Sequence, residues 1–296
     1  MLHVAEEIAS QPDCWVEAGR RSRHEGRLLP TSGERVAVVG CGTSWFVGHA
    51  YAALREAAGE GLTDAFPASE FPLDRDYDRV VAISRSGTTT EVLAVLDALR
   101  NRLPTVAITA DPATPVVEHA DEVVVLEFAD EQAVVQTRFA TTTLALLRSH
   151  IGEDLTPVIA DAWTALDAPL PVEALAREQF TYLGRGWTVG LAHEAALKMR
   201  EAALAWSESY PAMEYRHGPM SISDERSLVW SLGLAPEGLA RDVEGTSALW
   251  VESTLEPMAE LIRCQRLAVA LAVQRGLDPD CPRNLSRSVV LQPGGR

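Results

Sequence analysis

Short runs of β-branched residues alternate with longer stretches of helix-forming residues from Arg35 onward. The expected strands are Val36–Val39, Val80–Ile83, Thr105–Thr109 and Glu122–Leu126. The expected helices between and after them are Ser44–Ala58, Thr89–Arg100, Pro115–His119 and about Gln132–Ile151. Spacing of this kind predicts parallel βαβ units, and therefore an open α/β sheet that binds ligands at the carboxyl ends of its strands.

The same pattern restarts at Thr181, where "TYLGRGW" predicts a strand with a glycine turn and "AHEAALKMREAALAW" predicts a helix. "SLVWSLGLA" predicts another strand, and Leu255–Arg275 a late helix. Between the halves, Thr156–Pro171 holds three prolines, and "PLPVEALAREQF" predicts a linker with a lead-in helix. The glycine turns of "VVGCGTSW" and "YLGRGWTVG" lie about 145 residues apart and resemble one element used twice. We therefore expect two related α/β domains, residues 1–165 with an N-terminal helix and residues 166–296 with a C-terminal tail.

Composition restricts the class of protein. A chain of 296 residues with 47% hydrophobic content can bury one large or two medium cores. No apolar run is long enough for a membrane span, and "MLHVAEEIASQPDCW" has adjacent glutamates where a signal peptide would be basic, so we expect a soluble, cytoplasmic protein. The net charge of −16 opposes nonspecific binding to nucleic acid or anionic lipid. Four scattered cysteines favour reduced thiols over a disulfide scaffold or a zinc site.

The stretch "AISRSGTTTEV" (Ala82–Val92) crowds hydroxyl groups at the junction of an expected strand and an expected helix. A helix start presents unpaired N–H groups and a partial positive charge, which suit an anion. Arg85 adds a permanent cation whose fork fits phosphate. An N-cap in a polar turn would explain one or two hydroxyls, so five of them beside an arginine favour a phosphate site. The five are Ser84, Ser86, Thr88, Thr89 and Thr90.

A second rim, "GCGTSW" (Gly40–Trp45), follows the first expected strand and offers Thr43 and Ser44. Its G-x-G is weak evidence by itself. A dinucleotide fingerprint would need a third glycine soon after Thr43 and a ribose-binding acid downstream, and a Walker A loop would need Gly-Lys-Ser/Thr. The sequence has neither, which favours a small phosphate ester over a nucleotide.

Charged residues in the second half form a further candidate group. Glu194, Lys198 and Glu201 follow one another at intervals of four and three, so they share one face of a helix. That pattern alone would favour an exposed salt-bridge stripe. The following "SESYPAMEYRHGPMS" predicts an irregular loop rich in polar side chains, a type of segment that is often functional. His217 in this loop is either a hydrogen-bonded loop histidine or a proton carrier.

Six segments, taken in order, resemble the double sugar-isomerase (SIS) domain family, above all the isomerase half of glutamine:fructose-6-phosphate amidotransferase. They are "GCGTS", "SRSGTTTE", "LGRG", "EAALKMRE", "RHGPMS" and "PRNLSRSV". The resemblance runs from "EEIASQP" to "PRNLSRSV", nearly the whole chain. It implies two SIS-type three-layer α/β domains with parallel sheets.

The resemblance also implies roles for individual residues. Ser84, Ser86 and Thr89 match phosphate-binding hydroxyls, while Thr43 and Ser44 match a sugar-contacting turn; we add Arg85 and Gln136 to the binding set. Glu201 matches the base that moves a proton between C1 and C2, and Lys198 a neighbouring lysine. His217 matches the ring-opening histidine, which in the family comes from the partner subunit of a homodimer. The chemistry is consistent, because a carboxylate can serve adjacent carbons and an imidazole titrates near neutrality.

Three departures limit the match. Arg85 stands where the amidotransferase has glutamine, and Arg287, which we assign to the catalytic set, stands where it has a tail lysine. An arginine stays protonated and does not readily form a Schiff base. "LAPEGLARDVEGTSA" is shorter than the family segment, so we expect the second domain to have lost part of its sheet. With no glutaminase segment and thus no ammonia supply of its own, full glucosamine-6-phosphate synthesis is not expected.

The leading hypothesis is an enzyme, independent of metal or cofactor, that transfers a C1/C2 proton in a hexose or aminohexose 6-phosphate. Aldose–ketose isomerisation, amino-sugar phosphate deamination and fructosamine-6-phosphate deglycation remain open. A non-catalytic sugar-phosphate-binding regulator is the alternative of another class, although such regulators usually carry a DNA-binding helical domain.

Overall fold

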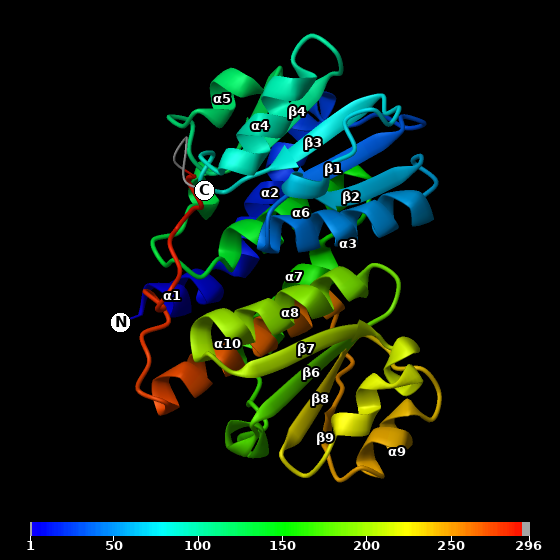
Figure 1. Ribbon diagram of the computed structural model, residues 1–296, viewed down its shortest axis with the longest axis vertical. Coiled ribbons are helices and arrows are strands. Elements are labelled where there is room, and N and C mark those ends of the chain that lie inside the picture. Colours follow the sequence, from blue (N-terminus) through cyan, green and yellow to red (C-terminus); the bar gives the residue numbers. More distant parts are fainter. Residues whose placement is uncertain (1, 292–296) are drawn as a thin grey trace. The chain divides into compact units, whose positions relative to one another are not determined.

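The computed structural model describes residues 2–291, which form two compact units (Figure 1). Within the described residues, unit A comprises Asp13–Glu131, Arg138–Leu155 and 286–291. Unit B comprises 2–12, Gln132–Thr137 and Thr156–Leu285. Each unit is therefore built from three segments that are not continuous in the sequence. The predicted boundary between two SIS-type domains at residues 165 and 166 stays a prediction.

Unit A contains a five-stranded parallel sheet of order β2-β1-β3-β4-β5. All four strands expected in this half are present, and β2 is additional. The strands are β1 (Val36–Gly40), β2 (Thr63–Pro67), β3 (Arg79–Ile83), β4 (Thr105–Thr109) and β5 (Glu122–Val125). The helices are α2 (Gln11–Glu25), α3 (Thr43–Ala57), α4 (Thr90–Leu99), α5 (Val116–His119) and α6 (Arg138–His150), with 3-10 turns η1 (Gly26–Leu28), η2 (Ala68–Glu70) and η3 (Glu127–Ala129).

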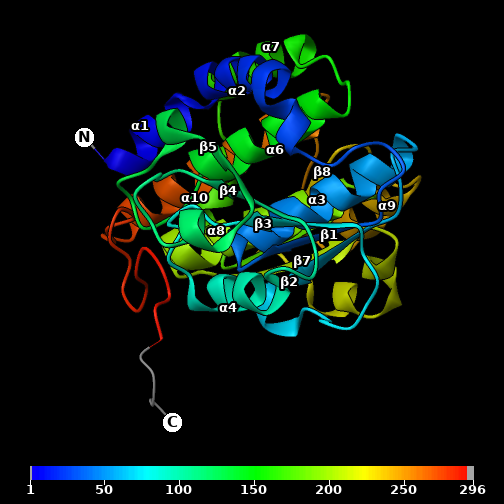
Figure 2. The ribbon, with the colours of Figure 1, turned by 90° about the horizontal axis from the view of Figure 1, so that it is seen from above.

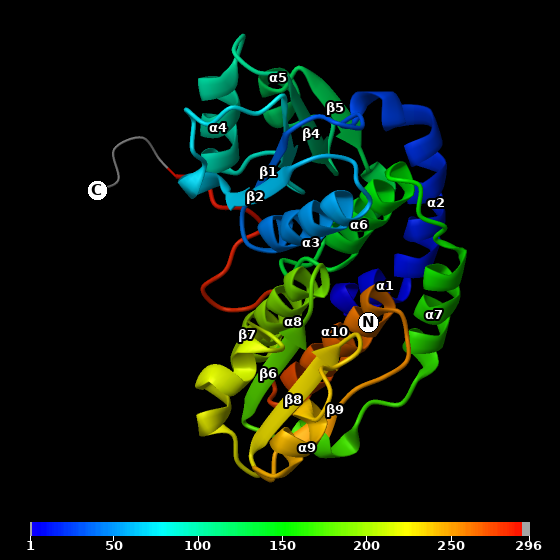
Figure 3. The ribbon, with the colours of Figure 1, turned by 90° about the vertical axis from the view of Figure 1, so that its right-hand side faces the viewer.

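Helices cover both faces of the unit A sheet. Helices α4 and α5 lie on the face opposite α3 and α6, as Figures 2 and 3 show. On the α4 side, Val92, Leu96 and Leu99 pack against Val39 and Val80 of the strands in one buried cluster. Burial on both faces explains why the central strands read as continuous apolar runs, and hence why the sequence predicts them well.

Unit B contains a four-stranded parallel sheet of order β7-β6-β8-β9. Helices α8 and α10 contact each other on one face, and α9 lies on the other (Figure 1). The strands are β6 (Gln179–Gly184), β7 (Trp206–Pro211), β8 (Ser227–Leu232) and β9 (Leu249–Val251). The helices are α1 (His3–Ala9), α7 (Thr156–Asp167), α8 (Thr188–Ala203), α9 (Leu239–Glu244) and α10 (Pro257–Gln274), with 3-10 turns η4 (Val172–Ala176), η5 (Glu214–His217) and η6 (Pro219–Ile222).

The two sheets share one topology, since β7-β6-β8-β9 repeats β2-β1-β3-β4 without the fifth strand. Both first strands end in the same Gly-x-Gly turn. A Cβ on Gly40 or Gly184 would lie 2.8 Å or 2.2 Å from the backbone of the helix that follows. Gly42 and Gly186 have φ angles of 53° and 58°, which glycine adopts without the steric cost of a Cβ. The prediction of one element used twice is confirmed, and the second sheet is the smaller one.

Two stretches differ from what the sequence predicts. The helix expected from about Gln132 begins only at Arg138, whose N–H donates to a Glu131 carboxylate oxygen at 2.6 Å and so fixes the helix start. The stretch Thr156–Pro171, for which the sequence predicts no helix, is mostly helix α7. Pro157 lies in its first turn, where a proline costs no hydrogen bond. Across residues 2–291, none of the helices combines the length and the apolar character that a membrane span requires.

Candidate active site

The strand order of unit A reverses at β1 and β3, which are neighbours in the sheet. Open α/β sheets bind ligands at the carboxyl ends of the strands at such a switch point. The two hydroxyl-rich rims predicted from the sequence both begin there, one after Gly40 and one after Ile83. Thr43 and Ser44 lie at the start of α3 and are only 4% and 5% exposed.

The loop Ser84–Thr89, which we call the phosphate loop, leads from β3 into α4 with Thr89 as the N-cap residue. Gly87 has a φ of 61°, and a Cβ there would lie 2.0 Å from the Thr114 hydroxyl, so this turn requires glycine. Among residues 2–291, the backbone N–H groups of Ser86 and Thr89 have no hydrogen-bond partner. Unpaired donors at a helix start form an anion-binding geometry.

The hydroxyls of the phosphate loop lie close to one another. The Ser86 Oγ accepts a hydrogen bond from the Thr88 N–H at 3.3 Å and lies 3.1 Å from the Thr88 hydroxyl. The Ser84 Oγ and Thr89 Oγ1 lie 3.5 Å apart. Ser84, Ser86 and Thr89 are therefore gathered on one loop beside two unpaired N–H groups.

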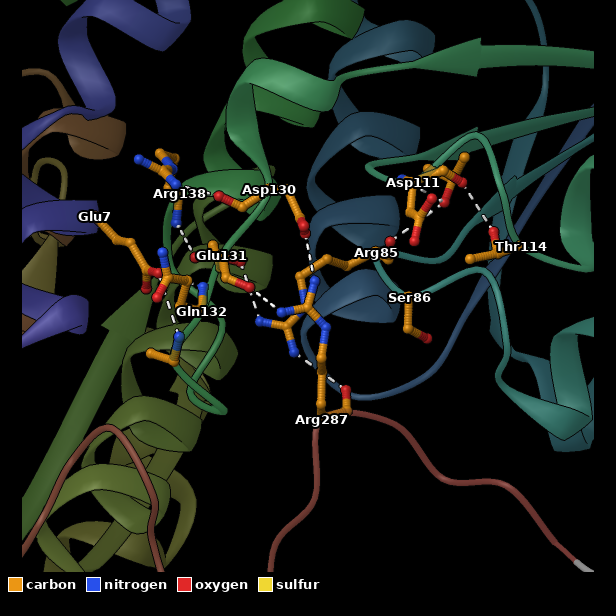
Figure 4. Close-up of polar contacts among 12 residues, drawn as sticks. Glu7, Arg85, Ser86, Asp111, Thr114, Asp130, Glu131, Gln132, Arg138 and Arg287 are labelled. Atoms are coloured by element: carbon orange, nitrogen blue, oxygen red, sulfur yellow. Dashed lines mark hydrogen bonds and ion pairs between the residues drawn. The ribbon is translucent and has the colours of Figure 1, made fainter.

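Arg85 does not extend in the direction of Ser86. Its side chain is 5% exposed and points toward Glu131, whose carboxylate lies 3.2 Å from the Arg85 guanidinium (Figure 4). The sequence predicts Arg85 to be a cation for the phosphate. In the structure its charge is matched by a buried carboxylate, and a role in phosphate binding stays a prediction.

Arg287 lies near the same cluster in unit A. Its guanidinium donates to the Asp130 carboxylate and to the Glu131 carbonyl. The structure thus brings the two arginines that depart from the family pattern to one place, because the Arg287 carbonyl also accepts from Arg85 at 3.1 Å. A catalytic role for Arg287 remains a prediction.

In unit B, helix α8 presents Glu194, Lys198 and Glu201 on one face. Lys198 is 1% exposed, lies 3.4 Å from the fully buried Glu194, and donates to Glu201. The exposed stripe that the spacing alone would favour is therefore wrong for Glu194 and Lys198. Glu201 differs, because its side chain is 20% exposed while it is paired with the Lys198 ammonium group.

His217 and Gln136 also belong to unit B. His217 ends the short turn η5 and is exposed, followed by Gly218 with a φ of 135°. Gln136 precedes α6, and its side-chain nitrogen is buried without a hydrogen-bond partner in the described chain. The assignments of both residues stay predictions.

Two buried carboxylates that pair with candidate residues were not assigned to the site from the sequence. Glu194 was noted for its spacing but not placed in the site, and only its complete burial distinguishes it from a surface residue. Glu131 gave no signal, because its partner Arg85 lies 46 residues away and neither residue marks the other in the sequence.

Comparisons with known proteins agree with this geometry. Residues 31–150 match the family model of the SIS domain, which includes both rims of the switch point. The glutamine–fructose-6-phosphate aminotransferase (isomerizing) of Synechocystis sp. is 28% identical to the chain over 88% of its length and 52% of its own. That of Halobacterium salinarum is also 28% identical, over 86% of this chain and 51% of its own. The chain spans about half the length of the curated relatives that it matches.

The chain is also similar to solved structures of a phosphosugar deaminase and a phosphosugar isomerase. A glucosamine-6-phosphate deaminase from Thermotoga maritima superposes with a TM-score of 0.81 at 25% identity, covering 98% of this chain and 100% of that one. A tagatose-6-phosphate ketose/aldose isomerase from Escherichia coli superposes with a TM-score of 0.79 at 19% identity, covering 98% and 96%, which shows the shared fold. The resemblance to phosphosugar isomerases and deaminases is thus confirmed.

Proposed function

We propose that this chain, a SIS-domain protein by its match over residues 31–150, is a cytoplasmic enzyme that moves a proton between C1 and C2 of a hexose or aminohexose 6-phosphate. The observation that carries the proposal is the phosphate loop, which gathers three hydroxyls and two unpaired N–H groups at the sheet's switch point. Such a site suits a dianionic phosphate ester because its donors are preorganised.

The proposed reaction gives residues of the candidate set their roles. The phosphate loop and the Thr43–Ser44 turn would bind the phosphate and the sugar. His217 would open the ring by exchanging the proton of the ring oxygen. Glu201 would then take the proton from one carbon and return it to the neighbouring carbon, while Lys198 holds the carboxylate in place. Either aldose–ketose isomerisation or amino-sugar phosphate deamination follows from the same enediol or enamine chemistry.

A product screen tests the proposed function. Purified protein is incubated with glucosamine 6-phosphate, with fructose 6-phosphate plus ammonia, and with fructosamine 6-phosphates, and the products are identified by mass spectrometry. We expect turnover of at least one hexose phosphate; release of a free amine from a fructosamine 6-phosphate would identify a deglycase instead. Binding of these compounds without turnover would favour the sugar-phosphate-binding regulator and overturn the enzyme.

The proposal includes two SIS-type domains and a homodimer with shared active sites. His217 is exposed and lies in a segment separate from the helix that carries Glu201, as expected of a residue donated to a partner subunit. Mixing equal amounts of E201Q and H217A before joint refolding should restore about a quarter of the activity, since about half of the dimers are heterodimers and each rebuilds one of its two sites. An active monomer in sedimentation, or mixtures that stay inactive, would rule out shared sites.

A further inference from the structure

Glu131 joins three segments of unit A that are distant in sequence. Its side chain is fully buried and accepts from Arg85 at 3.2 Å through one oxygen. The other oxygen accepts the Arg138 N–H at 2.6 Å, at the first residue of α6. Its carbonyl accepts from the guanidinium of Arg287. Figure 4 shows Arg85, Arg138 and Arg287 around Glu131.

Arg85 continues this connection to the end of the chain. Its two terminal nitrogens have different acceptors, because one contacts Glu131 and the other donates to the Arg287 carbonyl at 3.1 Å. The Arg85 backbone carbonyl is itself fixed at the end of β4, where the Thr109 hydroxyl and the Ala110 N–H both donate to it at 3.2 Å. The guanidinium therefore extends from an immobilised backbone.

Residues 286–291, which we call the tail, run along the phosphate loop. The Ser288 and Thr88 hydroxyls lie 2.9 Å apart. The Thr90 N–H donates to the Val289 carbonyl at 3.2 Å, and the Leu291 N–H donates to the Thr90 hydroxyl at 2.9 Å. The tail thus engages Thr88 and Thr90 and leaves Ser84, Ser86 and Thr89, which are the hydroxyls assigned to the phosphate.

We propose that Glu131 is a positioning residue that anchors the tail to the phosphate loop through Arg85 and Arg287. Arg85, whose charge is matched by the Glu131 carboxylate, links this buried carboxylate to the backbone of the tail. The inference concerns the ligand-free protein, and it rests on the proposed function only where it calls the loop a phosphate site. As a consequence, the tail already engages Thr88 and Thr90 in the ligand-free protein, and Ser84, Ser86 and Thr89 are left for the ligand.

Hydrogen exchange at the amides of Thr90 and Leu291 tests the anchor, because both amides bond to or from the tail. In ligand-free protein, E131Q should accelerate hydrogen exchange at these two amides by about tenfold or more. The substitution replaces the carboxylate that pairs with the Arg85 guanidinium, and Arg85 is the residue that holds the tail backbone. The matched control is E34Q. Glu34 and Arg79 form an ion pair of 3.2 Å in the same unit, and neither side chain bonds to residues 286–291. It should leave both amides at the wild-type rate.

R85K keeps the test decisive if E131Q fails to fold. Lysine preserves the charge opposite Glu131 but has one nitrogen where arginine has a fork, so it cannot hold both Glu131 and the tail in this geometry. We expect R85K to stay folded, yet to exchange the Thr90 and Leu291 amides about tenfold or more faster than the wild type. Wild-type exchange at both amides in R85K would overturn the anchor. The proposed function would fail separately, by wild-type protein that binds no hexose phosphate.

Discussion

Replacing Glu201 by glutamine should abolish turnover while leaving the protein folded. The amide has the shape of the carboxylate and no basicity, so the rate should fall by roughly the 10²–10⁴-fold that general base catalysis supplies. Exchange of the substrate C2 proton with deuterated water should disappear in the same variant, as followed by NMR on whichever hexose phosphate the product screen identifies. This measurement needs no knowledge of the net reaction.

The control for this prediction is binding. E201Q should retain the wild-type affinity for the sugar phosphate to within a few fold, because Glu201 is expected to act on carbon-bound protons and the phosphate loop belongs to another helix. As a helix-pairing residue only, Glu201 would contribute at most about 0.5 kcal/mol and nothing to turnover. Proton exchange at the wild-type rate in E201Q would therefore remove Glu201 from the chemistry.

The sequence predicts strands well where they are buried on both faces of the sheet, and poorly where they lie at its edge. Strands β1, β3 and β4 are buried along most of their length and read as unbroken apolar runs. The missed strands β2 and β7 are sheet edges with mostly half-exposed residues, and β9 has only three residues. Edge strands carry mixed patterns because one side faces solvent, so their sequences resemble loops.

The site shows a similar division. The phosphate loop could be located from the sequence because its hydroxyls and glycine act locally, at one strand–helix junction. The direction of the Arg85 side chain could not, since it depends on a buried carboxylate supplied by a distant segment. Burial likewise separates Glu194 from Glu201, although both occupy one helix face and spacing treats them alike.

The arrangement on helix α8 leads to the largest expected effect on stability. Lys198→Met keeps most of the side-chain volume but removes the ammonium 3.4 Å from the fully buried Glu194. A buried carboxylate that loses its cation costs about 3–5 kcal/mol, so the free energy of unfolding should fall by that amount in chemical denaturation. The double variant E194Q/K198M removes both charges and should recover most of the loss, because neither charge of this pair is then left buried without the other. If Lys198→Met alone costs less than about 1 kcal/mol, as an exposed pair would, then Glu194 does not depend on Lys198 and the buried ion pair on α8 does not stabilise the fold.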